Sequence, residues 1–259
     1  MNIKDLFNLK GKTAIVTGGG RGLGEQIALA YAEAGANVVV CSRNEEACKE
    51  VSERLEKLGV RSLALQCDVS NYYDIQNVVQ KTVEEFGTID ILVNNSGASW
   101  IAPALEMETD KWDRIMDINL KGVFLFSQAV GKVMVEQGSG KIINIASIFG
   151  LGGQDPKIAD SICYSTSKGA VINFTKDLSV KLAPYNVHVN AIAPGFFPTK
   201  MTKAGLDYLG EKVLERIPAG RIGSDFDIKG PALFLASKAS DYVFGHVLAV
   251  DGGTIAQVI

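Results

Sequence analysis

The stretch TAIVTGGGRGLGEQIALAYAEAGANVVVCSRN, residues 13–44, predicts how this chain folds. It begins with the β-branched run TAIVT, passes through a glycine-rich turn, and continues as an amphipathic segment before a second run, NVVVC. A strand, a tight turn, a helix and a second strand in that order form a βαβ unit, in which the two strands are parallel. We therefore expect a parallel sheet whose helices pack on its faces.

The rest of the chain repeats this alternation of short apolar runs and longer amphipathic segments. We expect strands at 13–17, 37–41, 62–67, 90–95, 141–146, 187–192 and 247–252, and helices near 22–35, 44–58, 71–86, 109–137, 162–184, 206–216 and 227–237. No linker, composition break or internal repeat divides the chain, which favours one doubly wound α/β domain over residues 1–259. The segments 150–161 and 194–210 follow strand ends and interrupt the alternation, so they are the expected substrate loops.

Composition narrows the classes of partner. A net charge of −3, with 21% charged residues and no basic run, gives no reason to expect nucleic acid. Only two histidines are present and the cysteines show no CxxC spacing, so we expect no metal site and free buried thiols in a reducing compartment. The N-terminus lacks the apolar region of a signal peptide, and no apolar run approaches about twenty residues. We therefore expect a cytoplasmic protein without a membrane segment.

The turn TGGGRGLG at 17–24 carries the first chemical signal. Gly18, Gly22 and Gly24 lack Cβ atoms, so a pyrophosphate could approach the backbone and lie at a helix N-terminus, where N–H groups favour an anion. The spacing is GxxxGxG rather than GxGxxG, and a plain tight turn is the alternative. The position between a strand and an amphipathic helix favours dinucleotide binding.

Ser42 and Arg43 follow the second strand, where a site that prefers NAD carries an acidic residue. Arg43 could form a charge-assisted pair with the 2′-phosphate of NADP, and Arg21 in the glycine turn could add a second contact. The two arginines predict NADP(H) as the preferred cofactor, with NAD(H) as the alternative. Each arginine, taken singly, is equally compatible with a solvated loop residue.

Tyr164 and Lys168 stand four residues apart, and Ser147 ends the apolar run KIINIAS upstream of them. In a helix, this spacing places a phenol and an ammonium on one face. Lowering a tyrosine pKa from about 10 to about 7 takes roughly 4 kcal/mol, which a cation about 4 Å away supplies at an effective dielectric of about 20. The pair could therefore act as an acid and base, although such spacing also occurs in surface couples.

Several short motifs occur in one order along the whole chain. They are TGGGRGLG at 17–24, CDV at 67–69, NNSG at 94–97, Asn119 in IMDINLKG, Ser147, YSTSK at 164–168 and APG at 193–195. On these motifs the chain resembles the short-chain dehydrogenase/reductase family. The segments SRN, APGFFPTKMT and ERIPAGRIG are most similar to its gluconate 5-dehydrogenase-like group. The resemblance implies a Rossmann-type domain with about seven parallel strands and helices on both faces.

The resemblance also implies roles for individual residues. Tyr164 would be the acid/base at the substrate oxygen, Ser147 would bond that oxygen, Lys168 would lower the Tyr164 pKa and hold the nicotinamide ribose, and Asn119 would anchor a water for proton supply. The implied cofactor-binding residues are Gly18, Arg21, Gly22, Leu23, Gly24, Ser42, Arg43, Asp68, Val69, Asn94, Asn95, Gly97, Tyr164, Lys168, Pro194, Gly195 and Thr199.

Each of these roles has a plain structural alternative. Ser147 could cap the next segment, Asn119 could bond locally, and Asn94 could serve a strand-end turn. The joint occurrence of the motifs favours the functional roles. Ser96 stands where the family usually has alanine, and we assign it no role from the sequence.

The substrate is less clearly written in the sequence. Gln154, Asp155 and Lys157 in the first loop, with Trp100 nearby, suit a hydroxylated or acidic substrate, and a mobile lid with solvated charges is the alternative. We expect an NAD(P)(H)-dependent oxidoreductase that interconverts a secondary alcohol and a ketone, on a sugar acid or polyol. The alternatives are a 3-oxoacyl-acyl-carrier-protein reductase and, in another class, a non-catalytic NADP-binding sensor or scaffold. The resemblance further implies a homotetramer.

Overall fold

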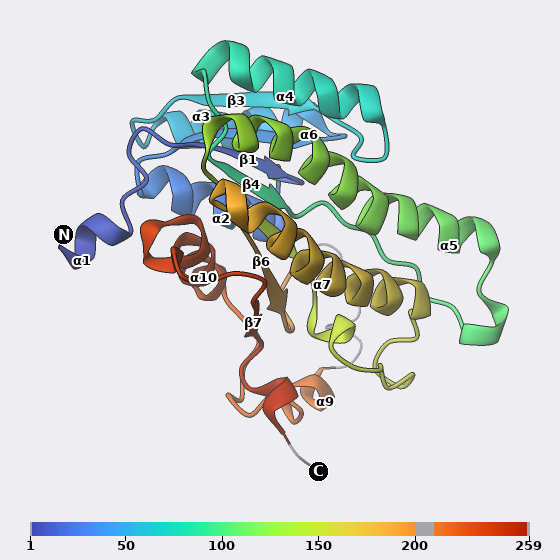
Figure 1. The fold of residues 1–259 in the computed structure, drawn as a ribbon. Helices are drawn as coiled ribbons and strands as arrows, with labels where there is room; N and C mark the ends of the chain where they lie inside the picture. The colour runs from blue at the N-terminus through green and yellow to red at the C-terminus, as the bar shows by residue number, and fades with distance from the viewer. Residues whose placement is uncertain (1, 200–209, 258–259) are drawn as a thin grey trace.

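The computed structural model describes residues 2–199 and 210–257, in which seven strands form one parallel sheet (Figure 1). The strands are β1 (Thr13–Thr17), β2 (Asn37–Ser42), β3 (Ser62–Gln66), β4 (Ile91–Asn94), β5 (Gly140–Ile145), β6 (Val187–Pro194) and β7 (Val247–Val250). Their order across the sheet is β3-β2-β1-β4-β5-β6-β7, and every neighbouring pair is parallel. The predicted fold class is confirmed.

Helices connect the strands at positions close to those expected. They are α1 (Ile3–Leu6), α2 (Gly22–Glu33), α3 (Glu45–Glu56), α4 (Tyr72–Phe86), α5 (Thr109–Met116), α6 (Gly122–Gln137), α7 (Ile162–Leu182), α9 (Glu211–Leu214) and α10 (Asp225–Ala236). The helix predicted over 109–137 contains a π-helical turn, Asp117–Lys121, between α5 and α6. Of the helix predicted over 206–216, α9 is the described part, and residues 206–209 lie outside the described residues. The short α1 was not expected from the sequence.

Helices cover both faces of the sheet because successive strand residues point to opposite sides. Ala14 and Val16 of β1 belong to the core that α2, α3 and α10 cover. Ile15, between them, belongs to the second core, which α4 and α6 cover. The β1 strand is consequently buried along its whole length, and Figure 1 shows helices on either side of the sheet.

The strand order reverses beside β1. The chain adds β2 and β3 on one side of β1, then returns through α4 to place β4 on the other side. The connections after β1 and β4 therefore leave the sheet toward opposite faces, and the carboxyl ends of these two strands border an open crevice. Ligands of doubly wound sheets bind at such a point.

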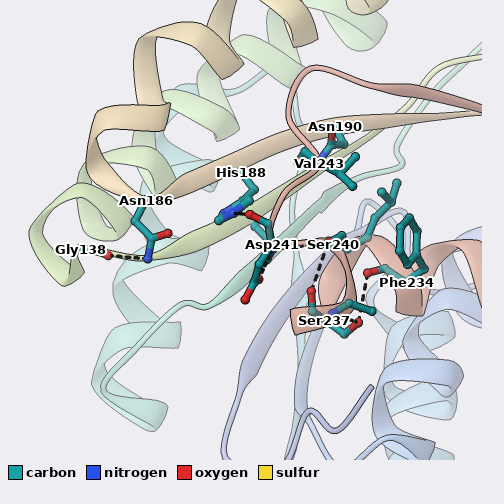
Figure 2. Close-up of polar contacts among 12 residues, drawn as sticks. Gly138, Asn186, His188, Asn190, Phe234, Ser237, Ser240, Asp241 and Val243 are labelled. Carbon is teal, nitrogen blue, oxygen red and sulfur yellow. Dashed lines mark hydrogen bonds and ion pairs between the residues drawn. The ribbon is translucent and has the colours of Figure 1, made fainter. Parts of the chain in front are cut away.

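Polar contacts at the amino end of β6 hold the chain that leads into β7 (Figure 2). The side-chain amide of Asn190 donates to the carbonyl of Val243 at 2.9 Å, and a ring nitrogen of His188 lies 3.0 Å from the carbonyl of Asp241. His188 is buried and stacks on Phe244, with ring centroids 4.2 Å apart. This histidine lies at the edge of the sheet opposite the crevice, so its role here is structural.

The run Thr109–Gln137 is long and apolar enough, by length and composition alone, to cross a membrane. Its side chains Phe126, Val130 and Met134 are instead fully buried in the core under the sheet. A core helix of this kind accounts for the apolar composition without a membrane. All four cysteines are free and buried, as the sequence predicts.

Candidate active site

The glycine turn lies where the strand order reverses, between the ends of β1 and β4. Gly18 and Gly22 have φ angles of 63° and 58°, in the left-handed region that favours glycine. α2 starts at Gly22, and its N-cap residue, Arg21, supplies no side-chain cap. At Gly22 an added Cβ would find its nearest neighbour 3.7 Å away on Thr199. The turn thus offers an anion an uncapped helix N-terminus with an open approach.

A cavity of about 490 Å³ occupies the crevice. Most of the predicted cofactor-binding residues line it: Gly18, Arg21, Gly22, Leu23, Ser42, Arg43, Asp68, Val69, Asn95, Gly97, Tyr164, Lys168, Pro194, Gly195 and Thr199. Ser147 lines the same cavity. Residues from the carboxyl ends of six strands, β1 to β6, therefore meet around one space, as expected for parallel strands whose carboxyl ends share an edge.

Gly24 and Asn94, which the resemblance places at the cofactor, do not line this cavity. A Cβ at Gly24 would lie 2.4 Å from both the Asn95 amide nitrogen and the Gly18 carbonyl oxygen, so this glycine lets α2 pack against the turn. The Asn94 side chain is buried beneath the floor and donates to Ser127 at 3.0 Å and to Asn144 at 2.9 Å. Both residues support the site from below.

Cationic side chains line one end of the cavity. Arg21 and Arg43 are exposed there, beside Ser42, whose hydroxyl donates to the backbone of Asn44. Burial raises the pKa of the Asp68 carboxyl, but hydrogen bonds from Ser70 and the nearby charges of Arg43 and Arg114 outweigh it, so the net direction is downward. Asp68 is therefore ionised at neutral pH, and the Arg43 charge favours this ionised form.

Ser147, Tyr164 and Lys168 form the opposite wall. Ser147 accepts a hydrogen bond from the Phe149 N–H at 3.2 Å, so it caps the 3-10 turn η3 (Ile148–Gly150) as well as lining the cavity. Lys168 is buried, donates to the Ile145 carbonyl at 2.6 Å, and places its ammonium 5.7 Å from the centre of the Tyr164 ring. The predicted catalytic serine, tyrosine and lysine are thus brought together.

The electrostatics of this wall differ from the expectation. Burial raises the pKa of Tyr164, and a hydrogen bond with Ser147 offsets part of that rise. Burial also lowers the pKa of Lys168 to about 8. We expected Lys168 to lower the Tyr164 pKa, but the ammonium lies at the ring and is bonded to a carbonyl oxygen. Without a nucleotide, the phenol is therefore held protonated at neutral pH.

Asn119 lies in the π-helical turn between α5 and α6 and is fully buried. Its amide nitrogen donates to the Ala98 carbonyl at 2.9 Å and to the Ser167 hydroxyl at 3.0 Å, while its amide oxygen accepts from the Ala98 N–H at 2.8 Å. Asn119 therefore links Ala98, in the loop after β4, to Ser167 of α7, which directly precedes Lys168. Its side chain does not line the cavity, so it positions the site. π-helical turns often occur at functional sites.

The side chains expected to meet a substrate lie outside this cavity. Gln154 accepts a hydrogen bond within its own loop, and the Asp155 carboxylate pairs with the Arg216 guanidinium at 2.8 Å. Lys157 is exposed, and Trp100, 41% exposed, packs beside the Lys111 ammonium. The loop folds back on itself and against the segment around α9. Residues 200–209 of the second expected substrate loop lie outside the described residues.

Several cavity residues were assigned no role from the sequence. They are Gly20, Asn44, Ala47, Ser96, Cys67, Ile118, Ile145, Ala146, Phe197 and Pro198. Most of them adjoin a motif residue, so adjacency to the motifs was the available signal. The spacing of polar residues alone does not reveal the apolar lining residues. Examples are Cys67, next to Asp68, and Phe197, two residues after Gly195.

Known proteins resemble this chain over its length. A family described as short chain dehydrogenase matches residues 12–207. A 2-dehydro-3-deoxy-D-gluconate 5-dehydrogenase of Dickeya dadantii is 43% identical over 98% of this chain and 100% of the relative. A 3-oxoacyl-acyl-carrier-protein reductase of Chlamydia muridarum is 42% identical over 95% of this chain and 98% of the relative. Both matches thus include the glycine turn and residues Ser147, Tyr164 and Lys168.

A solved structure supports the same likeness. A gluconate 5-dehydrogenase from Burkholderia cenocepacia J2315, in complex with NADP and tartrate, matches with a TM-score of 0.94 and 38% identity, covering 99% of this chain and 100% of that one. The agreement therefore extends to the whole backbone arrangement.

Gly150 lies where the turn η3 packs closely against the backbone of Lys168 and Gly169 in α7. A Cβ there would lie 2.6 Å from the Lys168 carbonyl carbon and 2.7 Å from the Gly169 nitrogen, and neither backbone atom can move freely. We expect Gly150→Ala to lower the free energy of unfolding in urea by about 1–3 kcal/mol. The matched change Gly152→Ala, where nothing lies within 4 Å, should stay within about 0.5 kcal/mol of the parent. Equal stabilities of the two variants would contradict this packing.

Lys168 should make stability depend on alkaline pH. Its pKa is about 8 in the folded chain and near its ordinary 10.5 when unfolded, so between these values the unfolded state binds more protons and folded stability rises with pH. We expect the parent to gain about 2–3 kcal/mol relative to Lys168→Met between pH 7 and pH 10.5, measured by urea unfolding without nucleotide. A stability difference that stays constant with pH would show that Lys168 titrates normally.

Proposed function

The chain belongs to the short-chain dehydrogenase family, and from that membership we propose that it interconverts a secondary alcohol and a ketone on a sugar acid, with NADP(H) as the preferred hydride carrier. It is an oxidoreductase that acts on alcohol and ketone groups with a nicotinamide cofactor. The observation that carries the proposal is one cavity in which the glycine turn faces Ser147, Tyr164 and Lys168. That arrangement joins a nucleotide site to an acid/base site.

The glycine turn fits a dinucleotide phosphate, because Gly18 and Gly22 leave the backbone open above an uncapped helix N-terminus. When bound, the nicotinamide supplies the hydride for a carbonyl carbon, or accepts it from an alcohol. Gly97, Pro194, Gly195 and Thr199 would line the space between this turn and the catalytic wall. A hydride added to the carbon and a proton added to the oxygen together make the alcohol.

Tyr164 supplies the proton in this proposal. Because burial raises its pKa, the phenol is protonated at neutral pH and ready to act as a general acid at a ketone oxygen. Ser147 would hydrogen-bond the same oxygen and stabilise the charge that develops there. Lys168, with a pKa of about 8, is mostly cationic at pH 7 and would stabilise the phenolate that remains. Asn119 holds α7 and the loop after β4 in register for this transfer.

The preference for NADP rests on charge at the end of β2. Arg43 and Arg21 line the cavity there, and Ser42 occupies the place of a carboxylate that would bind a ribose hydroxyl pair and repel a phosphate. The solved relative from Burkholderia was found with NADP, which supports the same choice.

A sugar acid is the substrate class that the relatives favour. The Dickeya relative is named for 2-dehydro-3-deoxy-D-gluconate and the Burkholderia structure for gluconate, and the latter holds tartrate. We propose the segments 150–161 and 194–210 as the substrate loops. Reduction of a 3-oxoacyl thioester is the second candidate, favoured by 42% identity to the Chlamydia reductase. A sensor without catalysis would have no need for Ser147, Tyr164 and Lys168 to share one wall.

We also propose that the protein is a cytoplasmic homotetramer built from one-domain subunits. β7 is an edge strand, and all four of its residues are only half-buried within one chain. An uncovered edge of this kind is suited to pairing with a second copy.

Replacing Tyr164 with phenylalanine removes only the phenol oxygen. We expect Tyr164→Phe to lower kcat for ketone reduction by at least about 100-fold, because general acid catalysis is lost, while the Kd for NADPH stays within about twofold. NADPH oxidation and fluorescence titration measure the two quantities. Tyr185→Phe, at an exposed position on the 3-10 turn Ala183–Tyr185, serves as the control and should match the parent. Near-parental kcat in Tyr164→Phe would refute the assigned role.

Arg43 should discriminate between the two nucleotides. A charge-assisted contact to a phosphate contributes enough that Arg43→Ala should weaken NADPH binding by about 10- to 100-fold and leave NADH binding nearly unchanged. Isothermal titration with both nucleotides measures the ratio. Arg61→Ala, whose guanidinium pairs with Glu85 away from the cavity, is the matched control. Equal losses for both nucleotides would mean that Arg43 does not read the 2′-phosphate.

A further inference from the structure

We propose that the Ser96 hydroxyl is an additional nucleotide contact, which donates a hydrogen bond to an oxygen of the ribose-phosphate backbone of NADP(H). The inference rests on the proposed function, because it places that nucleotide in the cavity between the glycine turn and the catalytic wall. Ser96 lines this cavity directly after Asn95. In the NNSG motif, Ser96 is the residue that differs from the family, which usually has alanine at this position.

The backbone around Ser96 is fixed from both sides. The N–H groups of Asn95 and Ser96 each donate to the Thr17 hydroxyl at 3.0 Å. The Asn95 side chain also donates to the carbonyl oxygens of Thr17 at 2.8 Å and Gly18 at 3.2 Å. A side chain attached to a backbone held in this way has a defined position before any ligand binds, which reduces the entropic cost of a contact.

The hydroxyl lies against the first glycine of the nucleotide-binding turn. A Cβ built on Gly18 would approach the Ser96 oxygen to 3.2 Å and the Ser96 Cα to 3.2 Å. The absence of that Cβ leaves the Ser96 side chain room beside the turn. A ligand that follows the turn therefore passes the Ser96 oxygen at close range.

Ser96 still has its hydrogen-bonding capacity to offer. Within residues 2–199 and 210–257, its hydroxyl makes no hydrogen bond to the protein, although the residue is half-buried. Ser99, three residues later in the same loop, shares a hydrogen bond with Ser161 at 3.0 Å and does not line the cavity. A hydroxyl can donate one hydrogen bond and accept others, which suits phosphate and ribose oxygens.

Alanine at this position would keep the backbone contacts to Thr17 and lose only the donor. A hydrogen bond of ordinary strength that is lost in this way corresponds to a Kd about fivefold higher. The serine would therefore tighten nucleotide binding without taking part in proton or hydride transfer.

The test compares Ser96→Ala with the parent and with Ser99→Ala in the full-length chain. NADPH and the fragment adenosine 2′,5′-bisphosphate are titrated by calorimetry, and urea unfolding is measured without nucleotide. We expect Ser96→Ala to raise the Kd for NADPH about fivefold at unchanged stability, and Ser99→Ala to leave that Kd unchanged. The same loss with the fragment assigns the contact to the adenosine half, including its 5′-phosphate, and a loss with NADPH alone assigns it to the nicotinamide-side phosphate or ribose.

Two results would overturn the inference. An NADPH Kd equal to that of the parent would show that the hydroxyl does not touch the nucleotide. Weaker NADPH binding by Ser96→Ala, accompanied by a matching loss of its stability without nucleotide, would show that the Ser96 hydroxyl has a structural role. A parent that does not bind NADPH would contradict the proposed function itself, whereas a parent that binds NADPH as tightly as Ser96→Ala does would contradict this inference alone.

Discussion

The two hydrogen bonds that the Thr17 hydroxyl accepts hold together strand ends that the sheet topology sends apart. β1 and β4 are neighbours, but their connections leave toward opposite faces, so the ladder between them stops at the crevice. The backbone N–H groups of Asn95 and Ser96 replace it by donating to Thr17, and the Asn95 side chain bonds back to the turn. The glycine turn is thereby fixed against the loop after β4, on the cavity that Ser147, Tyr164 and Lys168 also line.

The catalytic wall depends on buried polar groups that the fold must support. Placing Lys168 in the interior is unfavourable, and the carbonyl of Ile145 offsets part of that cost by accepting from the ammonium at 2.6 Å. Asn119 joins the loop after β4 to α7, and Gly150 lets η3 approach the backbone of α7 closely. A lowered lysine pKa beside a raised tyrosine pKa in a cavity is a pattern of functional sites more than of structural ones.

Most of the fold could be predicted because the strand runs are short, β-branched and separated by amphipathic segments. Most residues that line the cavity could also be predicted, since the carboxyl ends of parallel strands share one edge of the sheet. Contacts between distant segments could not be predicted: the approach of Gly24 to the Asn95 side chain, the burial of Asn94 beside Ser127, and the pairing of Asp155 with Arg216 depend on packing that spacing does not encode. The direction of the Tyr164 pKa was not predicted for the same reason, because burial raises it and a hydrogen bond with Ser147 offsets only part of that rise.

The central claim is that Tyr164 and the nucleotide cavity together carry out reduction of a keto sugar acid. Deuterium transfer tests it most directly: the protein is incubated with NADPH labelled at nicotinamide C4 and a panel of keto sugar acids and 3-oxoacyl thioesters, and products are analysed by NMR. The account predicts deuterium on the new carbinol carbon of a sugar acid. NADPH binding without deuterium in any product would contradict catalysis and favour a sensor, and labelling of the acyl thioester alone would contradict the substrate class.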